Sequence, residues 1–314
     1  CTWPVRGAPV VAEDTVYFAA GIWPFMGIFI YALDAATGEV VWVNDGQGAQ
    51  FMDHPHGGAR AFASVAPQGY MVLSGDKLLV ANGRATPAAF DRRTGRMLYF
   101  HLAENNKTGD FAASATERLF FNSGRAYLTE TGTPPASLGP QPVHTASAVY
   151  TVTDGAIAAY DPTDPRLEDA ADSKGNPIKK LTVQPLWRSK VAADRIHAMA
   201  GGALLCSTGK AISLVRLRDA EPWAEQVWRE ELPDEPASMA VADGKLFVST
   251  LGGRLLCYGT GEVAPPPPSL TPALPAAQPD SWTSRVADIL RVTGVTEGYC
   301  LCRGIENGRL ILEL

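Results

Sequence analysis

Residues 32–42 read ALDAATGEVVW and residues 89–99 read AFDRRTGRMLY, and these two segments decide the fold. Each has an aspartate, a threonine, a glycine and a final large aromatic residue at matching positions: Asp34, Thr37, Gly38 and Trp42; Asp91, Thr94, Gly95 and Tyr99. An aspartate side chain accepts backbone N–H bonds at a turn, and glycine supplies the positive φ that turns the chain back. Each segment is therefore predicted to form a strand, a tight turn and a second strand whose aromatic residue packs on a neighbouring unit.

Two looser copies of this unit follow along the chain. The third starts at Asp161 and reaches its aromatic residue only at Trp187, and the fourth surrounds Asp219 and ends at Trp228. Successive aspartates lie 57, 70 and 58 residues apart, which indicates a repeat protein. The insertion in the third copy, residues 163–180, mixes both charge signs with Pro and Gly, and we interpret it as a solvated insertion between strands.

Short alternating strands accompany the copies. Tight turns such as Asp-Gly and Ser-Gly predict β-hairpins at five places: residues 10–18, 70–80, 119–128, 149–158 and 239–248. Four strands per unit fit the blade of a β-propeller better than the coil of a solenoid. The sequence thus predicts an all-β fold of four-stranded antiparallel blades, of which we count four to five.

Composition excludes several classes of protein. Hydrophobic residues make up 46% and charged residues 19%, so the chain can bury a sizeable core and is not disordered throughout. The 27 Lys and Arg against 33 Asp and Glu give a net charge of −6 without a basic region, which argues against nucleic-acid binding. No apolar run approaches the roughly 20 residues of a membrane-spanning helix. The first residues contain no secretory signal pattern.

The run A-x-D-x-x-T-G-x-x-x-W resembles the tryptophan-docking repeat of PQQ-like, quinoprotein-type β-propellers, over roughly residues 7–259. That family includes quinone-dependent alcohol dehydrogenases and the BamB-like, non-enzymatic propellers of the bacterial outer-membrane assembly machinery. Because the resemblance implies about eight blades in a complete ring, we expect a partial propeller whose remaining blades belong to N-terminal sequence. Cys1 is compatible with a lipidated first residue or with a cut end, and we favour the cut because strands begin at once.

The repeat pattern stops after the propeller, which we place at residues 1–262. Residues 263–281 contain four consecutive prolines and are predicted to be a Pro-rich linker. In residues 282–314 the pattern predicts a helix at 282–292, a strand at 299–302, a glycine turn, and a second helix from residue 309. This order is typical of the start of a Rossmann-like α/β domain.

The glycine turn resembles the first motif of class I S-adenosylmethionine-dependent methyltransferases. Gly304, Glu306 and Gly308 occupy its positions, and Glu306 stands where the family has glycine. The resemblance implies the truncated start of a methyltransferase-like domain, which we do not expect to methylate anything by itself.

One cluster has the character of a metal site. Asp53, His54 and His56 lie in the loop FMDHPHGG, and imidazole and carboxylate groups suit zinc or iron. Loops between blades often line the end faces of a propeller, where function concentrates. A plain polar loop is the alternative interpretation. The other three histidines are isolated along the sequence and receive no role: His101, His144 and His197.

The favoured function is a non-catalytic scaffold that binds a protein partner or a ligand on its end faces, without a cofactor. One alternative, which the resemblance implies, is an oxidoreductase that uses PQQ with calcium. It is disfavoured because adjacent cysteines, which several family dehydrogenases place against the quinone, are absent and the repeat aspartates are assigned to turns. The other alternative is the propeller portion of a larger methyltransferase fusion that binds S-adenosylmethionine. The resemblance implies a bacterial, often extracytoplasmic protein, and the sequence leaves the compartment open.

Overall fold

The computed structural model describes residues 4–22, 26–46, 50–54, 59–82, 87–102, 113–140, 142–260, 279–297 and 308–314. The chain divides into two units, Cys1–Thr260 and Gly261–Leu314. The first unit contains all of the described strands, and the second contains the two described helices. Neither described helix has the length and apolarity that a bilayer crossing requires.

Five four-stranded antiparallel sheets and one three-stranded sheet follow one another along the first unit, and we number them blades 1 to 6. Blades 1 to 3 contain β1 (Val10–Ala12), β2 (Thr15–Ala20), β3 (Phe29–Asp34) and β4 (Val40–Asn44); β7 (Pro67–Ser74), β8 (Lys77–Asn82), β9 (Ala88–Asp91) and β10 (Met97–Tyr99); β11 (Ala113–Ala115), β12 (Leu119–Asn122), β13 (Arg125–Leu128) and β14 (Ala136–Ser137). Blades 4 to 6 contain β15 (Val143–His144), β16 (Val149–Thr153), β17 (Ala156–Ala171) and β18 (Pro177–Ala192); β19 (Arg195–Ala200), β20 (Ala203–Thr208), β21 (Ala211–Leu217) and β22 (Ala224–Glu231); β23 (Pro236–Ala242), β24 (Lys245–Thr250) and β25 (Leu255–Tyr258). All five predicted hairpins are confirmed.

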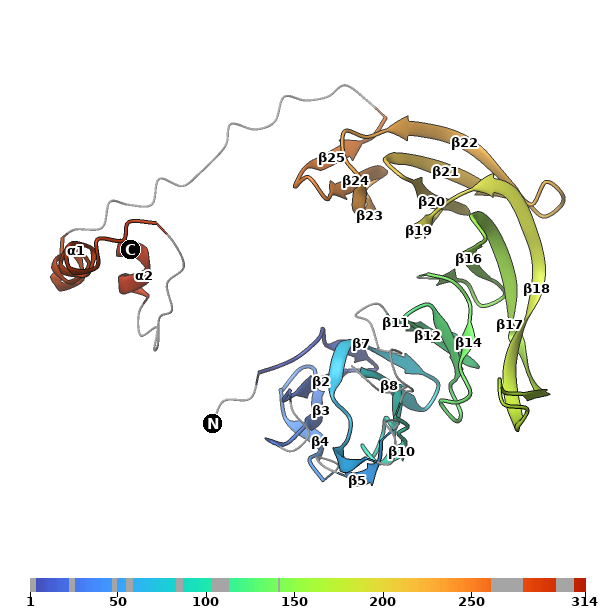
Figure 1. The fold of residues 1–314 in the computed structure, drawn as a ribbon, viewed down its shortest axis with the longest axis horizontal. Coiled ribbons are helices and arrows are strands. Elements are labelled where there is room, and N and C mark those ends of the chain that lie inside the picture. The colour runs from blue at the N-terminus through green and yellow to red at the C-terminus, as the bar shows by residue number, and fades with distance from the viewer. Residues whose placement is uncertain are drawn as a thin grey trace. The chain divides into compact units, whose positions relative to one another are not determined.

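The six blades stand side by side around an open arc, with first strands such as β7, β11, β19 and β23 on the inner side (Figure 1). Neighbouring first strands contact one another, as β7 does with β11 and β19 with β23. This is the radial arrangement of a β-propeller. Six blades are present in the described residues, so our count of four to five was too low.

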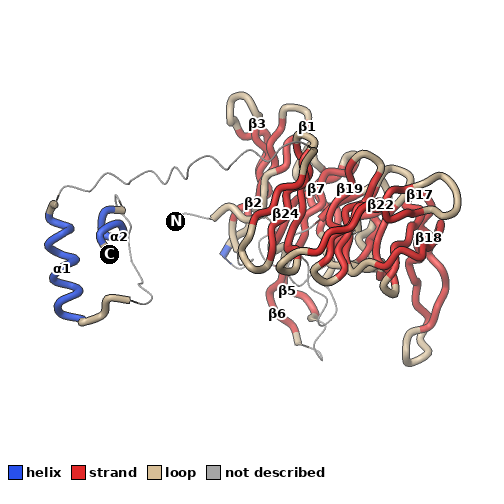
Figure 2. Tube along the Cα trace, turned by 90° about the horizontal axis from the view of Figure 1, so that it is seen from above, coloured by secondary structure: helices blue, strands red, loops and turns tan. Residues whose placement is uncertain are grey.

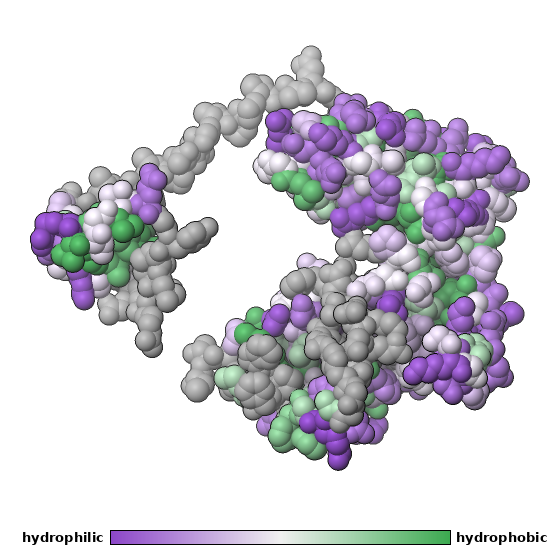
Figure 3. Space-filling model, in the orientation of Figure 1, coloured by the Kyte–Doolittle hydropathy of each residue, from purple (hydrophilic) through white to green (hydrophobic). Residues whose placement is uncertain are grey.

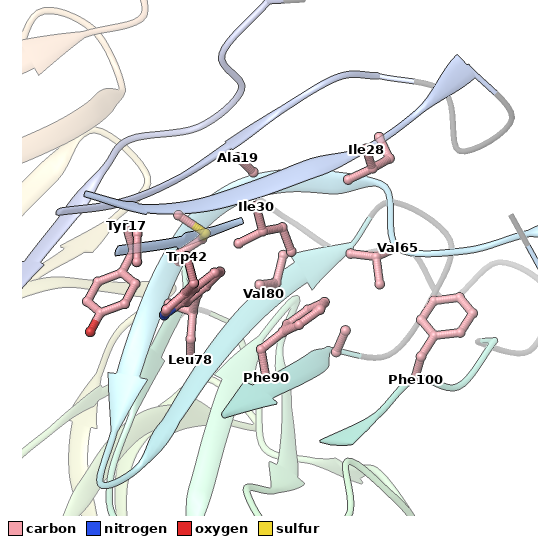
Figure 4. Close-up of a cluster of buried hydrophobic side chains, with 13 residues drawn as sticks. Tyr17, Ala19, Ile28, Ile30, Trp42, Val65, Leu78, Val80, Phe90 and Phe100 are labelled. Atoms are coloured by element: carbon pink, nitrogen blue, oxygen red, sulfur yellow. The ribbon is translucent and has the colours of Figure 1, made fainter. Parts of the chain in front are cut away.

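One buried apolar cluster lies at each contact between successive blades. Blades 1 and 2 share the cluster that contains Trp42, Ile30, Leu78 and Phe90 (Figure 4). Four further clusters join blades 2 and 3, 3 and 4, 4 and 5, and 5 and 6. No buried cluster of the described residues joins blade 6 to blade 1. Each blade is therefore held by its sequence neighbours, as in a linear repeat array.

The insertion at residues 163–180 is largely exposed, as predicted, but most of it belongs to the strands β17 and β18 and does not lie between strands. β17 and β18 have 16 residues each and continue as a paired ribbon beyond the blade. Both faces of the ribbon are exposed, so no apolar period marks these strands in the sequence. Cross-strand partners such as Asp169 and Lys179, 2.7 Å apart, support the register instead. Figure 3 shows hydrophilic residues covering the outer strands of blades 4 and 5.

Between blades 1 and 2 in the sequence, β5 (Gln50–Asp53) and β6 (Arg60–Ala63) form a two-stranded ribbon. The ribbon projects from the body of the blades (Figure 2). Met52 packs on the cluster between these blades. Phe51 and Phe62 form a cross-strand pair on the other face, with ring centroids 5.3 Å apart, and remain 55% and 65% exposed.

The second unit contains α1 (Ser281–Thr293) and α2 (Arg309–Glu313). The Asp280 carboxylate caps α1 by accepting the backbone N–H groups of Trp282 and Thr283, and Gly294 ends it with φ 66°. Both predicted helices are therefore confirmed. The described residues of this unit contain no strand, and the predicted strand at 299–302 lies outside them.

Candidate functional site

The repeated turn is built around one carboxylate oxygen. Asp34 Oδ1 accepts the backbone N–H groups of Ala36 and Thr37 at 3.0 and 2.8 Å, and the Thr37 hydroxyl at 3.0 Å. Asp91 accepts the same three bonds in blade 2, at 2.9 to 3.0 Å. These hydrogen bonds lower the pKa of both carboxyls. The backbone N–H of Thr37 has the largest effect on Asp34, and the hydroxyl of Thr94 has the largest effect on Asp91. These aspartates are occupied as turn residues.

The aromatic residue of each unit docks on the blade that follows. The Trp42 indole packs on the Gly95 turn of blade 2 and donates its Nε1–H to the Arg92 carbonyl at 2.9 Å. Tyr99 packs in the same way on Gly132 of blade 3, and its hydroxyl donates to the Thr129 carbonyl at 2.9 Å. Glycine is required at these turns because φ is positive and a ring covers the position of a Cβ.

The repeat tryptophans of blades 4 and 5 pack on an aromatic residue of the following blade instead of on a glycine turn. Trp187 stacks on Trp223 of blade 5 with centroids 6.4 Å apart and planes 4° from parallel. Trp228 meets Tyr258 of blade 6 edge to face at 5.6 Å.

The two later aspartates of the repeat depart from the first two. Asp161 lies inside β17 and accepts the backbone N–H and hydroxyl of Thr163 at 2.8 and 2.6 Å. Asp219 lies in the exposed bend after β21 and makes no side-chain hydrogen bond to a described residue.

Of the predicted metal cluster, the structure places Asp53 at the end of β5 and His54 directly after it. Asp53 pairs with Arg60 at 2.8 Å, and both side chains are exposed. His54 Nε2 is buried and has no partner in the described part of the chain, while His56 lies outside that part. No group of three metal-ligating side chains occurs among the described residues. The metal site therefore stays a prediction, and Asp53 already has an ionic partner.

The predicted cofactor loop falls largely outside the described residues, which exclude Gly304 and Glu306. Gly308 adopts φ 75° immediately before α2 and offers no side-chain cap. Because α2 has five residues, it is too short to offer the dipole of a long helix to an anion.

The first polar concavity is an end-face groove of about 550 Å3. It runs over the turns between the first two strands of blades 2, 3 and 4. Hydrogen bonds between blades hold it: the Ser74 hydroxyl donates to the Thr116 carbonyl at 2.9 Å, and the Arg118 guanidinium donates to the Thr163 carbonyl at 3.0 Å. His144 lines the groove, and burial lowers its pKa, so the imidazole is neutral at pH 7.

The second concavity is a channel cavity of about 410 Å3 on the inner side of the arc. The first strands of blades 2 to 6 contribute to its lining, including Tyr70, Arg195, His197 and Ser238. His197 Nε2 lies 2.8 Å from the Ser207 hydroxyl. Burial, and secondarily the charge of Arg195, lowers the pKa of His197 to about 4. In the sequence His197 is isolated and receives no role, and Arg195 is not marked by any motif, because only the arrangement of the blades brings these strands together.

The shifted pKa of His197 predicts a pH dependence of stability. An unfolded histidine has a pKa of about 6.5, so between about pH 6.5 and 4 the unfolded chain binds a proton that the folded chain excludes. The free energy of unfolding is therefore expected to fall as the pH is lowered through this window. Urea titrations across it should show a shallower decline for His197→Gln than for the unchanged chain. Equal slopes would contradict the assignment.

Comparison with known proteins gives one family match. The model of the family described as outer membrane protein assembly factor BamB matches residues 1–166. A search of curated proteins finds no match. Among solved structures, BamB from Moraxella catarrhalis is similar over 83% of this chain and 84% of its own, at 14% identity and a TM-score of 0.41. Dihydro-heme d1 dehydrogenase NirN in complex with DHE is similar over 84% of this chain and 57% of its own, at 13% identity and a TM-score of 0.43.

Proposed function

The chain belongs to the family of the outer membrane protein assembly factor BamB, and on that premise we propose that it is a propeller scaffold that holds a protein partner in the end-face groove. The family match spans residues 1–166, and all of the residues that line the groove fall within it. We further propose that the partner takes part in outer membrane protein assembly, as the family description implies for its members.

The observation that carries this proposal is the groove itself. Its floor consists of turns from three blades and of Pro162 and Thr163 in β17. Hydrogen bonds join the turn of blade 2 to that of blade 3, and the turn of blade 3 to β17. A concave surface that is already ordered loses little conformational entropy when a partner binds. Exposed Glu117 and Arg118 at its rim offer both charge signs to the polar side chains of a partner segment. Binding of an extended segment or a loop is the interaction that this shape favours.

Site-specific crosslinking tests the proposal. The photo-crosslinking residue p-benzoylphenylalanine at Ala146, which is exposed in the groove, should give a discrete adduct with one assembly protein in cells. The matched control places it at Lys174, exposed at the tip of the β17–β18 ribbon, where no such adduct is expected. Arg118→Glu should weaken the adduct at Ala146. Equal adducts at both positions, or none at Ala146, would overturn the proposal.

The residues present do not fit the quinone alternative. A PQQ site of the kind that the family resemblance implies holds its calcium with carboxylate and amide oxygens. No aspartate or glutamate is among the described residues that line the channel cavity, and Arg195 brings a positive charge to it. A cation beside this guanidinium would be repelled. The scaffold function is therefore preferred, and no step of quinone chemistry is derived.

A further inference from the structure

The channel cavity contains a positive charge that no described residue neutralises. Arg195 is half-buried at the start of β19. Its Nη1 donates to the Ala237 carbonyl at 3.2 Å, and its Nε is buried without a hydrogen-bond partner in the described part of the chain. Arg195 forms no ion pair with a described residue. Because a guanidinium taken out of water without a counter-charge costs free energy, an anion in the cavity would offset part of this cost.

His197, two residues further along β19, adds a second polar atom without a partner. Its Nε2 lies 2.8 Å from the Ser207 hydroxyl, whereas its Nδ1 is buried and has no hydrogen-bond partner among the described residues. When Nε2 accepts from this hydroxyl, Nδ1 carries the proton of the neutral ring and is a donor without an acceptor. Both His197 and Arg195 line the cavity, so donors gather there while the described lining offers no carboxylate.

The rest of the lining indicates which kind of anion fits. Phe121, Pro142 and Val143 give the cavity an apolar wall, and Ser114 and Ser238 bring hydroxyl groups. Its volume of about 410 Å3 falls in the range of small-molecule sites, about 300–1,000 Å3. One guanidinium among neutral groups matches one negative charge, and a planar carboxylate can accept two parallel N–H bonds from it. A phosphate monoester, with a charge of about −1.5 to −2 at pH 7, would leave negative charge uncompensated.

We propose that the channel cavity binds a single carboxylate group with an aliphatic body, held by the guanidinium of Arg195. The carboxylate belongs to a free small acid or to the C-terminus of a protein chain. This site goes beyond the partner proposed for the end-face groove. Ser123 and Gly124, directly after β12, line the cavity, whereas Glu117 and Arg118, directly before β12, line the groove. The two concavities therefore lie at opposite ends of this strand, and a ligand in one does not occupy the other.

Calorimetric titrations of the full chain test the proposal with two matched pairs of probes. Hexanoate is paired with the neutral hexanamide, and the peptide acetyl-Ala-Ala-Leu with a free C-terminus is paired with its C-terminal amide. We expect saturable binding of the acids and at least about tenfold weaker binding of the amides, because the bond to a charged group is lost. Tighter binding of hexanoate supports a free acid as the ligand, and tighter binding of the peptide supports a chain end. Equal affinity of acid and amide in both pairs, no saturable binding of either acid, or inorganic phosphate binding as tightly as the acids would overturn the proposal.

The imidazole of His197 reports where the acid binds. An anion beside it favours the protonated ring, so saturation with hexanoate should raise the pKa of His197 from its value of about 4. Arg195 and Tyr70 are the other ionisable groups of the described lining, and neither is negatively charged in this pH range. NMR titration of the histidine ring signals measures the shift, with His101 as the internal control. Equal changes at His197 and His101 would contradict binding in the cavity.

A matched pair of variants tests the role of the guanidinium. Arg195→Gln should weaken hexanoate by at least about tenfold. Arg229→Gln is the control, because Arg229 is exposed on β22 and its replacement removes the same charge from the chain. It should bind like the unchanged chain. Arg195→Lys keeps the charge without the two parallel donors and should also bind hexanoate more weakly, which provides the test if Arg195→Gln does not fold. Equal affinity of the Arg195 and Arg229 variants would contradict the assigned site.

Discussion

Replacing Trp42 by alanine is expected to lower the free energy of unfolding by about 3–5 kcal/mol, the range for truncating a buried large aromatic residue. Trp42 is 9% exposed and lies in the cluster between blades 1 and 2. Its loss leaves a cavity and also removes the indole donor to the Arg92 carbonyl. Urea unfolding followed by circular dichroism measures the change. A loss within about 0.5 kcal/mol, the size of an ordinary surface substitution, would contradict the docking role.

Trp42→Phe is the control for this prediction. Phenylalanine keeps a ring on Gly95 but has no indole N–H. Trp42→Phe therefore loses the hydrogen bond and part of the ring area without leaving the large cavity of Trp42→Ala. We expect a clearly smaller loss than for Trp42→Ala. Equal losses in the two variants would mean that packing on Gly95 is not what stabilises the contact.

Gly95→Ala is expected to destabilise the chain far more than Gly38→Ala. A Cβ at Gly95 would overlap the Trp42 ring at 2.7 Å, whereas a Cβ at Gly38 meets no atom of the described residues within 4 Å. Both glycines have similar positive φ, 71° and 74°, so both variants carry the same backbone strain of about 1–3 kcal/mol. Overpacking adds about 1–3 kcal/mol at Gly95 alone.

The difference between the two urea midpoints isolates the overlap with Trp42. Gly95→Ala should unfold at a distinctly lower urea concentration than Gly38→Ala. Equal midpoints would show that the aromatic ring does not confine Gly95.

Blades 1 and 2 were predictable because their turn chemistry is local. Asp34 and Asp91 satisfy turn N–H groups within three residues, so the sequence pattern and the structural unit coincide. The turn of blade 3 reads TGTPP and lacks the aspartate, so the repeat pattern does not mark this blade. Its hairpin at residues 119–128 was predicted, but nothing local shows that Tyr99 docks on Gly132.

The candidate sites were less predictable than the blades. The end-face groove and the channel cavity gather residues from blades far apart in the sequence, so no local motif marks them. The predicted metal loop illustrates the opposite problem. Asp53 and His54 are adjacent in sequence, but the pairing of β5 with β6 gives Asp53 an ionic partner in Arg60. The spacing of these residues showed which side chains could bind a metal, but it did not show that Arg60 pairs with Asp53.

The open arc of blades is tested most directly by hydrogen exchange of the Trp42→Ala protein, followed by mass spectrometry. If each blade is held only by its sequence neighbours, exchange should accelerate in peptides from β2 and β3 and remain unchanged in peptides from β24 and β25. Acceleration in β24 and β25 as well would show that blade 6 depends on blade 1. The ring would then be closed, which contradicts an open arc in which each blade is held only by its sequence neighbours.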